Sequence, residues 1–364
     1  MTEAWINVGD AEREAAACLE PGPLGYFAGG AGDELTLAEN LEAWKRWRFR
    51  PRVLVDTSRI ATEIELFGRP LAMPLLVAPV AYQRLAHPDG EIGMARAAAA
   101  ADTVMCLSTL ATTRPSEVAA AVPAGRRWFQ LYQFRDEAIT RALMEEAVAA
   151  GFEAIVVTVD APPGGNRERD QRTGFQIPAD LGVPSVAAAL GGDRAVTIHE
   201  TFELMTRAMG WEDFADLASE AGVPVLVKGI LTPEDAALAV EHGAAAVVVS
   251  NHGGRQLDRS PATADVLPGI VDAVAGRVPV LVDGGIRRGI DVAIALALGA
   301  DAVLVGRPAL WGLAAAGEDG AARVLAMLRA ELELALALCG ATTPAGLTRA
   351  HLQRAPLAGV YSRQ

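Results

Sequence analysis

Two residues three positions apart, His252 and Arg255, could act together on an acidic substrate. A neutral imidazole accepts a proton near pH 7, and a guanidinium binds a carboxylate through two hydrogen bonds. Gly253 and Gly254 lie between them, and glycine lets the backbone turn and a flat ligand approach closely. The pair follows the apolar run 244–249, which we interpret as a buried strand. This arrangement favours proton removal next to a carboxylate.

Eight short apolar runs recur along the chain, and each has the continuous aliphatic or β-branched character of a strand buried on both faces. They span residues 75–80, 104–108, 128–132, 154–160, 223–230, 245–251, 278–284 and 302–307. Helical patterns with capping residues and terminal glycines separate several of them, at 136–151, 211–222, 232–243 and 288–299. This eightfold alternation predicts an α/β fold of the (β/α)8 TIM-barrel class.

We predict a single domain over residues 1–364, in which the barrel, residues 71–340, carries two additions. Residues 1–70 precede the first strand and are interpreted as an N-terminal helical extension. The interval between the fourth and fifth strands is far longer than one helix, so about 163–209 is an insertion. Long loops at the top of a barrel often close over a ligand, which favours a mobile lid; a passive surface loop is the alternative.

The composition is that of a globular enzyme, with 51% hydrophobic and 21% charged residues among 364. A net charge of −13 argues against nucleic acid or an anionic membrane as a partner. The three cysteines form no metal-type pair and the histidines show no ligand spacing, so we expect a reducing compartment and no metal. Neither a signal peptide nor a membrane span is visible, which favours a soluble, cytoplasmic enzyme.

Polar residues gather where the strands end, which is where barrel enzymes place their active sites. Unpaired buried charges are costly, so lysine, aspartate, histidine and arginine at such positions indicate a function. The set at the strand ends is Ala78, Pro79, Val80, Ala81, Ser108, Gln130, Tyr132, Thr158, Asp160, Lys228, Ser250, His252, Asp283, Gly284, Gly285, Gly306 and Arg307.

Glycines and arginines follow the seventh and eighth strands, in residues 283–288 and 306–308. Glycine N–H groups together with arginine bind a phosphate dianion, and the loops at these positions of a barrel commonly do so. The alternative is a pair of ordinary glycine-rich turns that carry surface arginines. The barrel register favours the phosphate site.

Three further charged residues each have two interpretations. Asp160 could orient His252 and stabilise the imidazolium, or it could be a turn residue before two prolines. Lys228 needs an anionic partner and could form a purely structural ion pair with Asp283. Arg167 could be a second carboxylate binder or a solvated arginine of the insertion.

These blocks resemble the FMN-dependent 2-hydroxy acid oxidase and dehydrogenase family, which includes glycolate oxidase, lactate oxidase and mandelate dehydrogenase. The similarity runs from about Tyr26 to the C-terminal helix, and its most specific blocks are 130–132, 158–160, 165–167, 227–229, 250–258 and 283–288. The resemblance implies FMN as the cofactor, a small 2-hydroxy acid as the substrate and O2 as the acceptor that yields hydrogen peroxide. It also implies a homo-oligomer, commonly a tetramer.

The resemblance further implies a role for each residue. His252 is the catalytic base that Asp160 orients, and Lys228 faces the flavin edge that becomes negative on reduction. Arg167 and Arg255 bind the substrate carboxylate, and Tyr132 binds the substrate hydroxyl. The full substrate-binding set is Tyr26, Leu110, Tyr132, Arg167, His252 and Arg255. The flavin ring set is Ala78, Pro79, Val80, Ala81, Ser108, Gln130, Thr158, Lys228 and Ser250. The phosphate set is Asp283, Gly284, Gly285, Arg287, Gly306 and Arg307. Without the resemblance, the sequence would place Tyr26 and Tyr132 only in the hydrophobic core, each with its hydroxyl hydrogen-bonded.

The residue two positions after Ser108 sets the expected substrate. Glycolate oxidases tend to carry a bulky tryptophan there, whereas this chain has Leu110. A smaller apolar wall should admit a longer side chain, so we expect a lactate-like or larger L-2-hydroxy acid as the substrate.

Several alternatives stay open. The flavin could pass its electrons to a quinone or another acceptor, or the product could be decarboxylated as in lactate monooxygenase. Whether C2 loses a proton or a hydride is also open. Other FMN barrels, of the isopentenyl diphosphate isomerase or inosinate dehydrogenase type, share the phosphate site but lack the His252 and Arg255 pair with Arg167. A non-catalytic flavin-binding barrel would have lost the base or the arginines.

Overall fold

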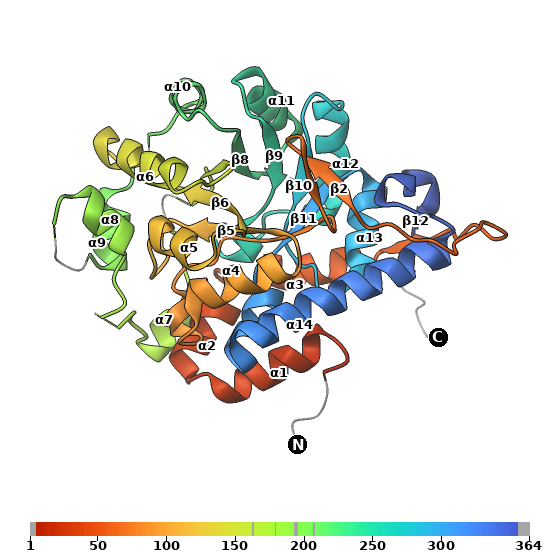
Figure 1. Cartoon of the computed structure of the whole chain (residues 1–364), viewed down its shortest axis with the longest axis horizontal. Coiled ribbons are helices and arrows are strands. Elements are labelled where there is room, and N and C mark those ends of the chain that lie inside the picture. The colour runs from red at the N-terminus through yellow and green to blue at the C-terminus, as the bar shows by residue number, and fades with distance from the viewer. Residues whose placement is uncertain (1–4, 162–163, 179, 193–195, 207, 356–364) are drawn as a thin grey trace, which may run out of the picture.

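Eight parallel strands close into a barrel in the computed structural model, which describes residues 5–161, 164–178, 180–192, 196–206 and 208–355 (Figure 1). The strands are β4 (Leu75–Val77), β5 (Val104–Ser108), β6 (Arg126–Leu131), β7 (Ile155–Thr158), β8 (Val225–Ile230), β9 (Ala246–Val249), β10 (Val280–Val282) and β11 (Ala302–Val305). The barrel closes through the pairing of β11 with β4. The predicted (β/α)8 fold is confirmed, although most strands end one to three residues earlier than predicted.

Helices surround the barrel and connect consecutive strands. They are α4 (Gly90–Ala100), α5 (Pro115–Ala121), α6 (Glu137–Ala149), α10 (Trp211–Glu220), α11 (Pro233–Glu241), α12 (Thr263–Val274), α13 (Gly289–Leu298) and α14 (Arg307–Cys339). The predicted capping residues act as expected, because the side chains of Asp136 and Thr232 accept hydrogen bonds from the first turns of α6 and α11. The last helix, α14, is not regular throughout, because its backbone departs from helical geometry at Ala316 and Gly317.

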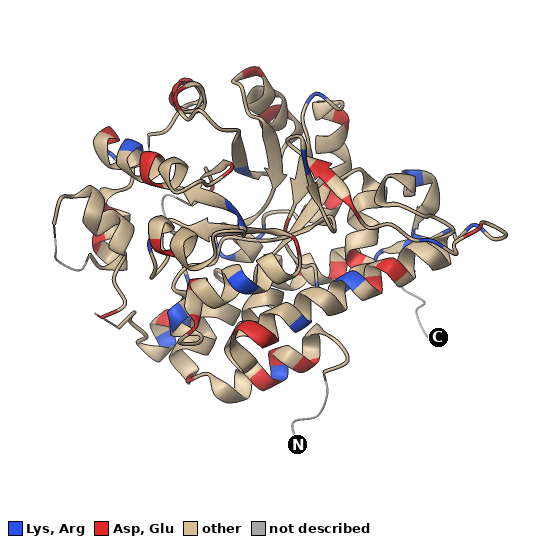
Figure 2. Cartoon of the chain, viewed as in Figure 1, with Lys and Arg blue, Asp and Glu red and all other residues tan. Residues whose placement is uncertain are grey.

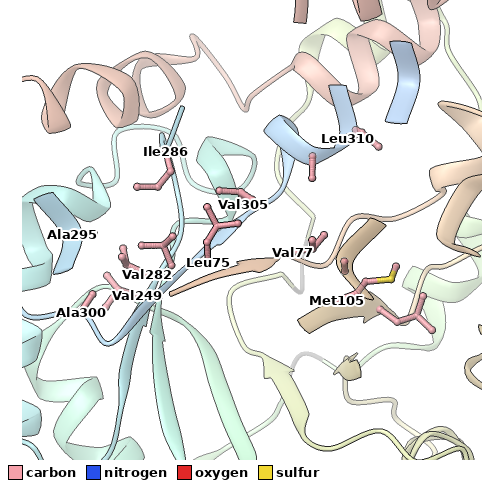
Figure 3. Packing of buried hydrophobic residues seen from close by; sticks show 14 of the residues in the cluster. Leu75, Val77, Met105, Val249, Val282, Ile286, Ala295, Ala300, Val305 and Leu310 are labelled. Carbon is pink, nitrogen blue, oxygen red and sulfur yellow. The ribbon is translucent and has the colours of Figure 1, made fainter. Parts of the chain in front are cut away.

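Successive strand residues face two separate apolar cores, as the twofold period of a strand requires. Leu75 and Val77 pack outward with Val282, Val305 and residues of the helices (Figure 3). Leu76, which lies between them, belongs to the second core, inside the barrel. This core also contains Trp128 of β6, Val248 of β9 and Leu304 of β11. The strands are therefore buried on both faces, which explains their continuous apolar runs.

Residues 5–71 form helices and short strands that cover the two ends of the barrel. The helices are α1 (Val8–Cys18), α2 (Pro21–Ala28) and α3 (Leu35–Trp44). The hairpin of β2 (Ile64–Leu66) and β3 (Arg69–Leu71) closes the N-terminal end, where the Phe67 ring lies 5.7 Å from that of Trp128. The extension, predicted to be helical, also contains β1 (Trp47–Phe49), which pairs with β12 (Leu352–Arg354). Three-residue strands with a distant partner leave no periodic signal.

The insertion after β7 carries α7 (Glu168–Thr173), α8 (Pro184–Ala189) and α9 (Ile198–Leu204). Its described residues are docked on the barrel, because Met205 bridges to Phe134 and the Arg135 N–H donates to the Leu204 carbonyl. The predicted span 163–209 also includes residues 163, 179, 193–195 and 207, which lie outside the described residues. Motion of this segment as a lid stays a prediction.

Charged residues are mainly on the outer helices and loops, with a few on or next to the barrel strands (Figure 2). Three cysteines, Cys18, Cys106 and Cys339, are free thiols. Within the described ranges, no helix is long and apolar enough to cross a membrane.

Candidate active site

A cavity of about 1050 Å³, its open mouth included, lies at the C-terminal end of the barrel. All but two of the residues predicted for the site line this cavity. Asp160 and Ser250 are the exceptions. Asp160 contacts His252, and Ser250 contacts Lys228, both of which line the cavity. The polar residues at the strand ends therefore converge on one cavity, as predicted. Their individual roles stay predictions.

The candidate base and its partner come from different strand ends. Asp160 follows β7 and its Oδ1 lies 2.9 Å from the Nδ1 of His252, which follows β9. Burial lowers the pKa of His252 below its ordinary 6.5, although Asp160 acts in the opposite direction. Burial favours protonated Asp160, but His252 and Lys228 hold the pKa of this carboxyl below its ordinary value. The pair can therefore present a neutral imidazole beside a carboxylate at pH 7.

A glycine next to Lys228 makes room for this carboxylate. Gly229 has a φ of 118°, and a Cβ there would lie 2.8 Å from the Cβ of Asp160. The turn that carries His252 is fixed from the N-terminal extension, because the amides of Asn40 and Asn251 exchange hydrogen bonds of 2.9 and 2.8 Å. Sequence reasoning did not find the roles of Gly229 and Asn40, since each depends on a partner that is distant along the chain.

Lys228 is buried at the end of β8, where its ammonium lies 3.1 Å from Asp283 and donates to the Ser250 hydroxyl at 2.9 Å. Burial acts to lower the pKa of Lys228, but Asp283 and Asp160 raise it above the ordinary value, so the cation persists. The ion pair considered from sequence is thus present. Asp283 Oδ1 is nevertheless buried without a hydrogen-bond partner in the described protein.

The half-buried side chains of Arg167 and Arg255 line the cavity, and neither forms an ion pair with a carboxylate of the described residues. Burial and the nearby Arg167 lower the pKa of Arg255 to about 10. Arg255 lies over the Tyr26 ring at 5.0 Å and donates to the Gly29 carbonyl at 3.0 Å, while the Nε of Arg167 has no partner within the described chain. The positive charge of Arg167 disfavours the charged form of Arg255, so an anion bound beside the two groups would be stabilised.

The residues predicted to hold FMN fit a flat ligand with a phosphate. Gln130 Nε2 and Thr158 Oγ1 line the cavity and are buried without hydrogen-bond partners in the described protein. These are groups that can bind the polar edge of a ring. Gly284 and Gly285 have φ values of 95° and 79°, and a Cβ on Gly285 would lie 1.9 Å from the Asn40 carbonyl oxygen. Only glycine can therefore form this loop beside the cavity.

Arg307, predicted to bind the phosphate, also joins two segments of the protein through backbone carbonyls. Its Nε, Nη1 and Nη2 donate to the carbonyls of Phe27, Gly253 and Gly29, each at 2.9 Å. The guanidinium thereby ties α2 to the turn that carries His252, while its terminal nitrogens keep further N–H groups. Sequence reasoning foresaw the cation at this position and missed these backbone contacts.

Further residues line the cavity that were not predicted from sequence. Phe202 comes from α9 of the insertion, and no strand-end pattern marks it. The remaining ones are mostly apolar or backbone contributors: Phe27, Gly253, Ile286, Leu304, Val305, Pro308 and Leu310. Phe202 and Leu110 thus give the cavity apolar lining from different parts of the chain.

Comparisons with known proteins agree with this site. The FMN-dependent dehydrogenase family profile matches residues 15–354. The L-lactate oxidase of Nostoc sp. is 47% identical over 345 residues, which are 92% of this chain and 94% of the relative. The glycolate oxidase of Spinacia oleracea is 44% identical over 352 residues, 95% of each chain.

Solved structures give the same result. A crystal structure of a mandelate oxidase superposes with a TM-score of 0.90 at 42% identity, covering 97% of this chain and 100% of the other. A putative lactate oxidase of Pediococcus acidilactici reaches a TM-score of 0.92 at 37% identity, covering 98% and 97%. This chain therefore belongs to the FMN-dependent dehydrogenase family and is an FMN-dependent oxidoreductase.

Proposed function

We propose that this enzyme oxidises L-2-hydroxy acids, lactate-like or larger, to 2-oxo acids and returns the electrons to O2 as hydrogen peroxide. The observation that carries the proposal is that His252, which pairs with Asp160, lines the same cavity as Arg167 and Arg255, two arginines without an ion pair among the described residues. A base next to an anion site suits a substrate whose reacting carbon bears a carboxylate. The relatives named above are called oxidases of lactate, glycolate and mandelate, which are all 2-hydroxy acids.

Each residue has a defined task in this reaction. FMN, when bound, would supply the acceptor for the two electrons of the substrate. Arg167 and Arg255 bind the carboxylate and fix C2, so that orientation lowers the barrier. Tyr132 holds the hydroxyl, and His252 accepts a proton while Asp160 stabilises the imidazolium that forms. These tasks require the carboxylate, the hydroxyl and the base to meet at one carbon, which the shared cavity permits.

Lys228 and the polar strand ends serve the cofactor. The Lys228 ammonium supplies positive charge where negative charge develops on reduction. Its contacts with Asp283 and Ser250 keep it in place without a bound substrate. Gln130 and Thr158 offer an amide and a hydroxyl for the ring edge, and the glycines after β10 offer backbone N–H groups for the phosphate.

The apolar walls of the cavity favour substrates larger than glycolate. Leu110 is buried and lines the cavity, and Phe202 lies beside the same space. A substrate with a methyl or larger group on C2 can bury that group against the two side chains, whereas glycolate cannot. One methylene in a hydrophobic pocket is worth about 1–3 kcal/mol, so the preference should be at least about tenfold.

The proposal is tested by mixing the FMN-loaded enzyme anaerobically with a series of L- and D-2-hydroxy acids and following loss of the oxidised-flavin absorbance. We expect fast bleaching by one enantiomer, with lactate or a larger acid ahead of glycolate, and fast recovery with peroxide when air is admitted. Bleaching without fast recovery would assign another electron acceptor. Glycolate as the best substrate would contradict the size preference, and no bleaching by any acid would contradict the proposed reaction.

We also propose that the enzyme is a cytoplasmic homo-oligomer. The free thiols of Cys18, Cys106 and Cys339 suit a reducing compartment. The exposed apolar side chains of Val53, Leu54 and Val55 suit self-association, and tetramers are common in the family that the sequence resembles. Light scattering of the purified holoenzyme measures the assembly, and cell fractionation measures the location; a single-chain mass or a secreted product would contradict the respective proposal.

A further inference from the structure

A loop formed by residues 53–60 projects from the barrel, and both of its ends are fixed at one turn. The N–H of Arg52 donates to the Cys339 carbonyl at 3.0 Å, and that of Ala61 donates to the Thr342 carbonyl at 2.9 Å. The two ends therefore meet at the turn after α14. Figure 1 shows this segment, in orange, extending past that end of the molecule. Loops with closely spaced ends often carry function.

The tip of this projecting loop is apolar and lies in solvent. Val53 is 81% exposed, Leu54 is fully exposed and Val55 is also exposed. Leu54 has a φ of 60°, a conformation that leucine rarely adopts. Leu334 and Leu338, one turn apart near the end of α14, are 60% and 67% exposed. Exposed apolar groups that gather on one part of a surface often mark interaction sites, so the loop tip is a candidate for such a site.

The projecting loop and its flanks are basic, although the chain as a whole has a net charge of −13. Arg48, Arg50, Arg52 and Arg59 are all exposed, whereas Asp56 is the one acidic residue from 48 to 60. No ion pair within the described ranges neutralises any of these four arginines. The loop therefore combines an apolar tip with unpaired positive charge, which fits an acidic surface with an apolar depression.

The same chain offers such a surface on another side, over α10 and α11. We call it the acidic face and define it by the exposed residues Glu212, Asp213, Asp216, Glu220, Glu234 and Glu241. Neither helix contains a lysine or an arginine, and Figure 2 shows red without blue on both. Arg141 of α6 pairs with Glu220 at the edge of this face, and the other five carboxylates have no lysine or arginine partner among the described residues. The helices are neighbours, because the Trp211 ring stacks on that of His242 with centroids 5.6 Å apart.

A pocket lies at the base of the acidic face. Its volume is about 930 Å³ with the open mouth included, and its apolar lining comprises Val159, Met209, Trp211, Phe214 and Ile230. Asp235 also lines it. An apolar side chain that is surrounded by arginines could bury itself here while the arginines meet the carboxylates around it. The pocket and the projecting loop are thus both apolar at the centre and carry opposite charges around it.

We propose that the projecting loop of one copy docks on the acidic face of a second copy, with Leu54 and its neighbours in the pocket. The proposal rests on the self-association proposed above and names the surfaces that produce it. Two different patches on one chain form a heterologous contact, which closes a ring when its rotation allows. The apolar tip forms the dry centre of the contact and the opposite charges form its rim. The charged rim makes assembly sensitive to salt.

Light scattering of the FMN-loaded enzyme tests the loop. We compare wild type with Val53→Ser/Leu54→Asn, since asparagine tolerates the left-handed backbone of position 54 and leaves the isolated chain folded. The wild-type mass should be a multiple of the chain mass, and the loop variant should fall to one chain. The matched control Ile6→Asn changes another exposed aliphatic side chain and should keep the wild-type mass. A single-chain wild type, or a loop variant that keeps its mass, overturns the proposal.

A second variant tests the acidic face and the head-to-tail geometry. Glu212→Lys/Asp216→Lys should also fall to one chain, because it reverses the charge around the pocket. Mixing the loop variant with this variant leaves one intact loop and one intact face, which together can form a single contact. We expect a species of two chains in that mixture. A face variant with the wild-type mass, or a mixture of single chains only, overturns the assignment. The masses require no turnover, so their outcome is independent of the proposed reaction.

Discussion

A side chain on Gly229 would place its Cβ 2.8 Å from the Cβ of Asp160, and Asp160 is the residue that contacts His252. The glycine that follows Lys228 therefore determines whether the carboxylate can stand beside the imidazole. Its φ of 118° is a second reason why an L side chain does not fit.

We predict that Gly229→Ala moves Asp160 away from His252 and lowers kcat/KM by about 10²-fold, the cost of misplacing a catalytic group by about 1 Å. Stopped-flow reduction by the best acid measures the effect. Gly243→Ala is the matched control, because Gly243 also has a positive φ but has nothing within 4 Å of its would-be Cβ. Equal losses of rate in the two variants would assign the effect to backbone strain instead.

The pH dependence follows from the environment of His252. Burial lowers the pKa of His252 below 6.5, and the base must be neutral to accept a proton. Activity should therefore be lost only as the pH falls through a midpoint below 6.5. Asp160→Asn removes a group that raises this pKa, so the midpoint should move lower still while the rate drops about 10²–10⁴-fold. The pH profile of kcat/KM reports the free enzyme. A wild-type midpoint above 6.5, or an upward shift in the variant, would be inconsistent with this assignment.

Because Arg167 and Arg255 repel each other, replacing Arg167 should have opposite effects on stability and on activity. Arg167→Met relieves the repulsion that lowers the pKa of Arg255, so Tm of the holoenzyme should stay the same or rise. The same change removes a charged hydrogen bond to the substrate carboxylate, which is worth about 1.5–3 kcal/mol, or about 10- to 10²-fold in kcat/KM. Arg172→Met serves as the control, since Arg172 is exposed on α7 and pairs with Glu168. Loss of both Tm and activity would indicate a structural role for Arg167.

Sequence patterns predicted the fold well because a parallel barrel buries every strand on both faces. The eight apolar runs are therefore continuous, and the polar residues that end them mark the site, as Asp160 and Lys228 do. What could not be predicted depends on contacts between distant segments. The pairing of β1 with β12, the exchange of hydrogen bonds between Asn40 and Asn251, and the placement of Phe202 have no local signal.

Leu110 should control the size of the substrate. We predict that Leu110→Trp fills the apolar region and lowers kcat/KM for lactate and larger acids at least tenfold relative to glycolate. A series of acids of increasing chain length measures the change in rank order. Leu190→Trp, at an exposed position after α8, controls for the added bulk. An unchanged rank order in Leu110→Trp would remove Leu110 from the substrate wall.

The most direct measurement of the central claim is anaerobic reduction of bound FMN by an L-2-hydroxy acid in wild type and in His252→Ala. The claim predicts that the variant still binds FMN, because the residues assigned to the cofactor are untouched, and that its reduction rate falls by at least about 10²-fold. A variant that binds FMN and is reduced as fast as wild type would contradict the assignment of His252 as the base.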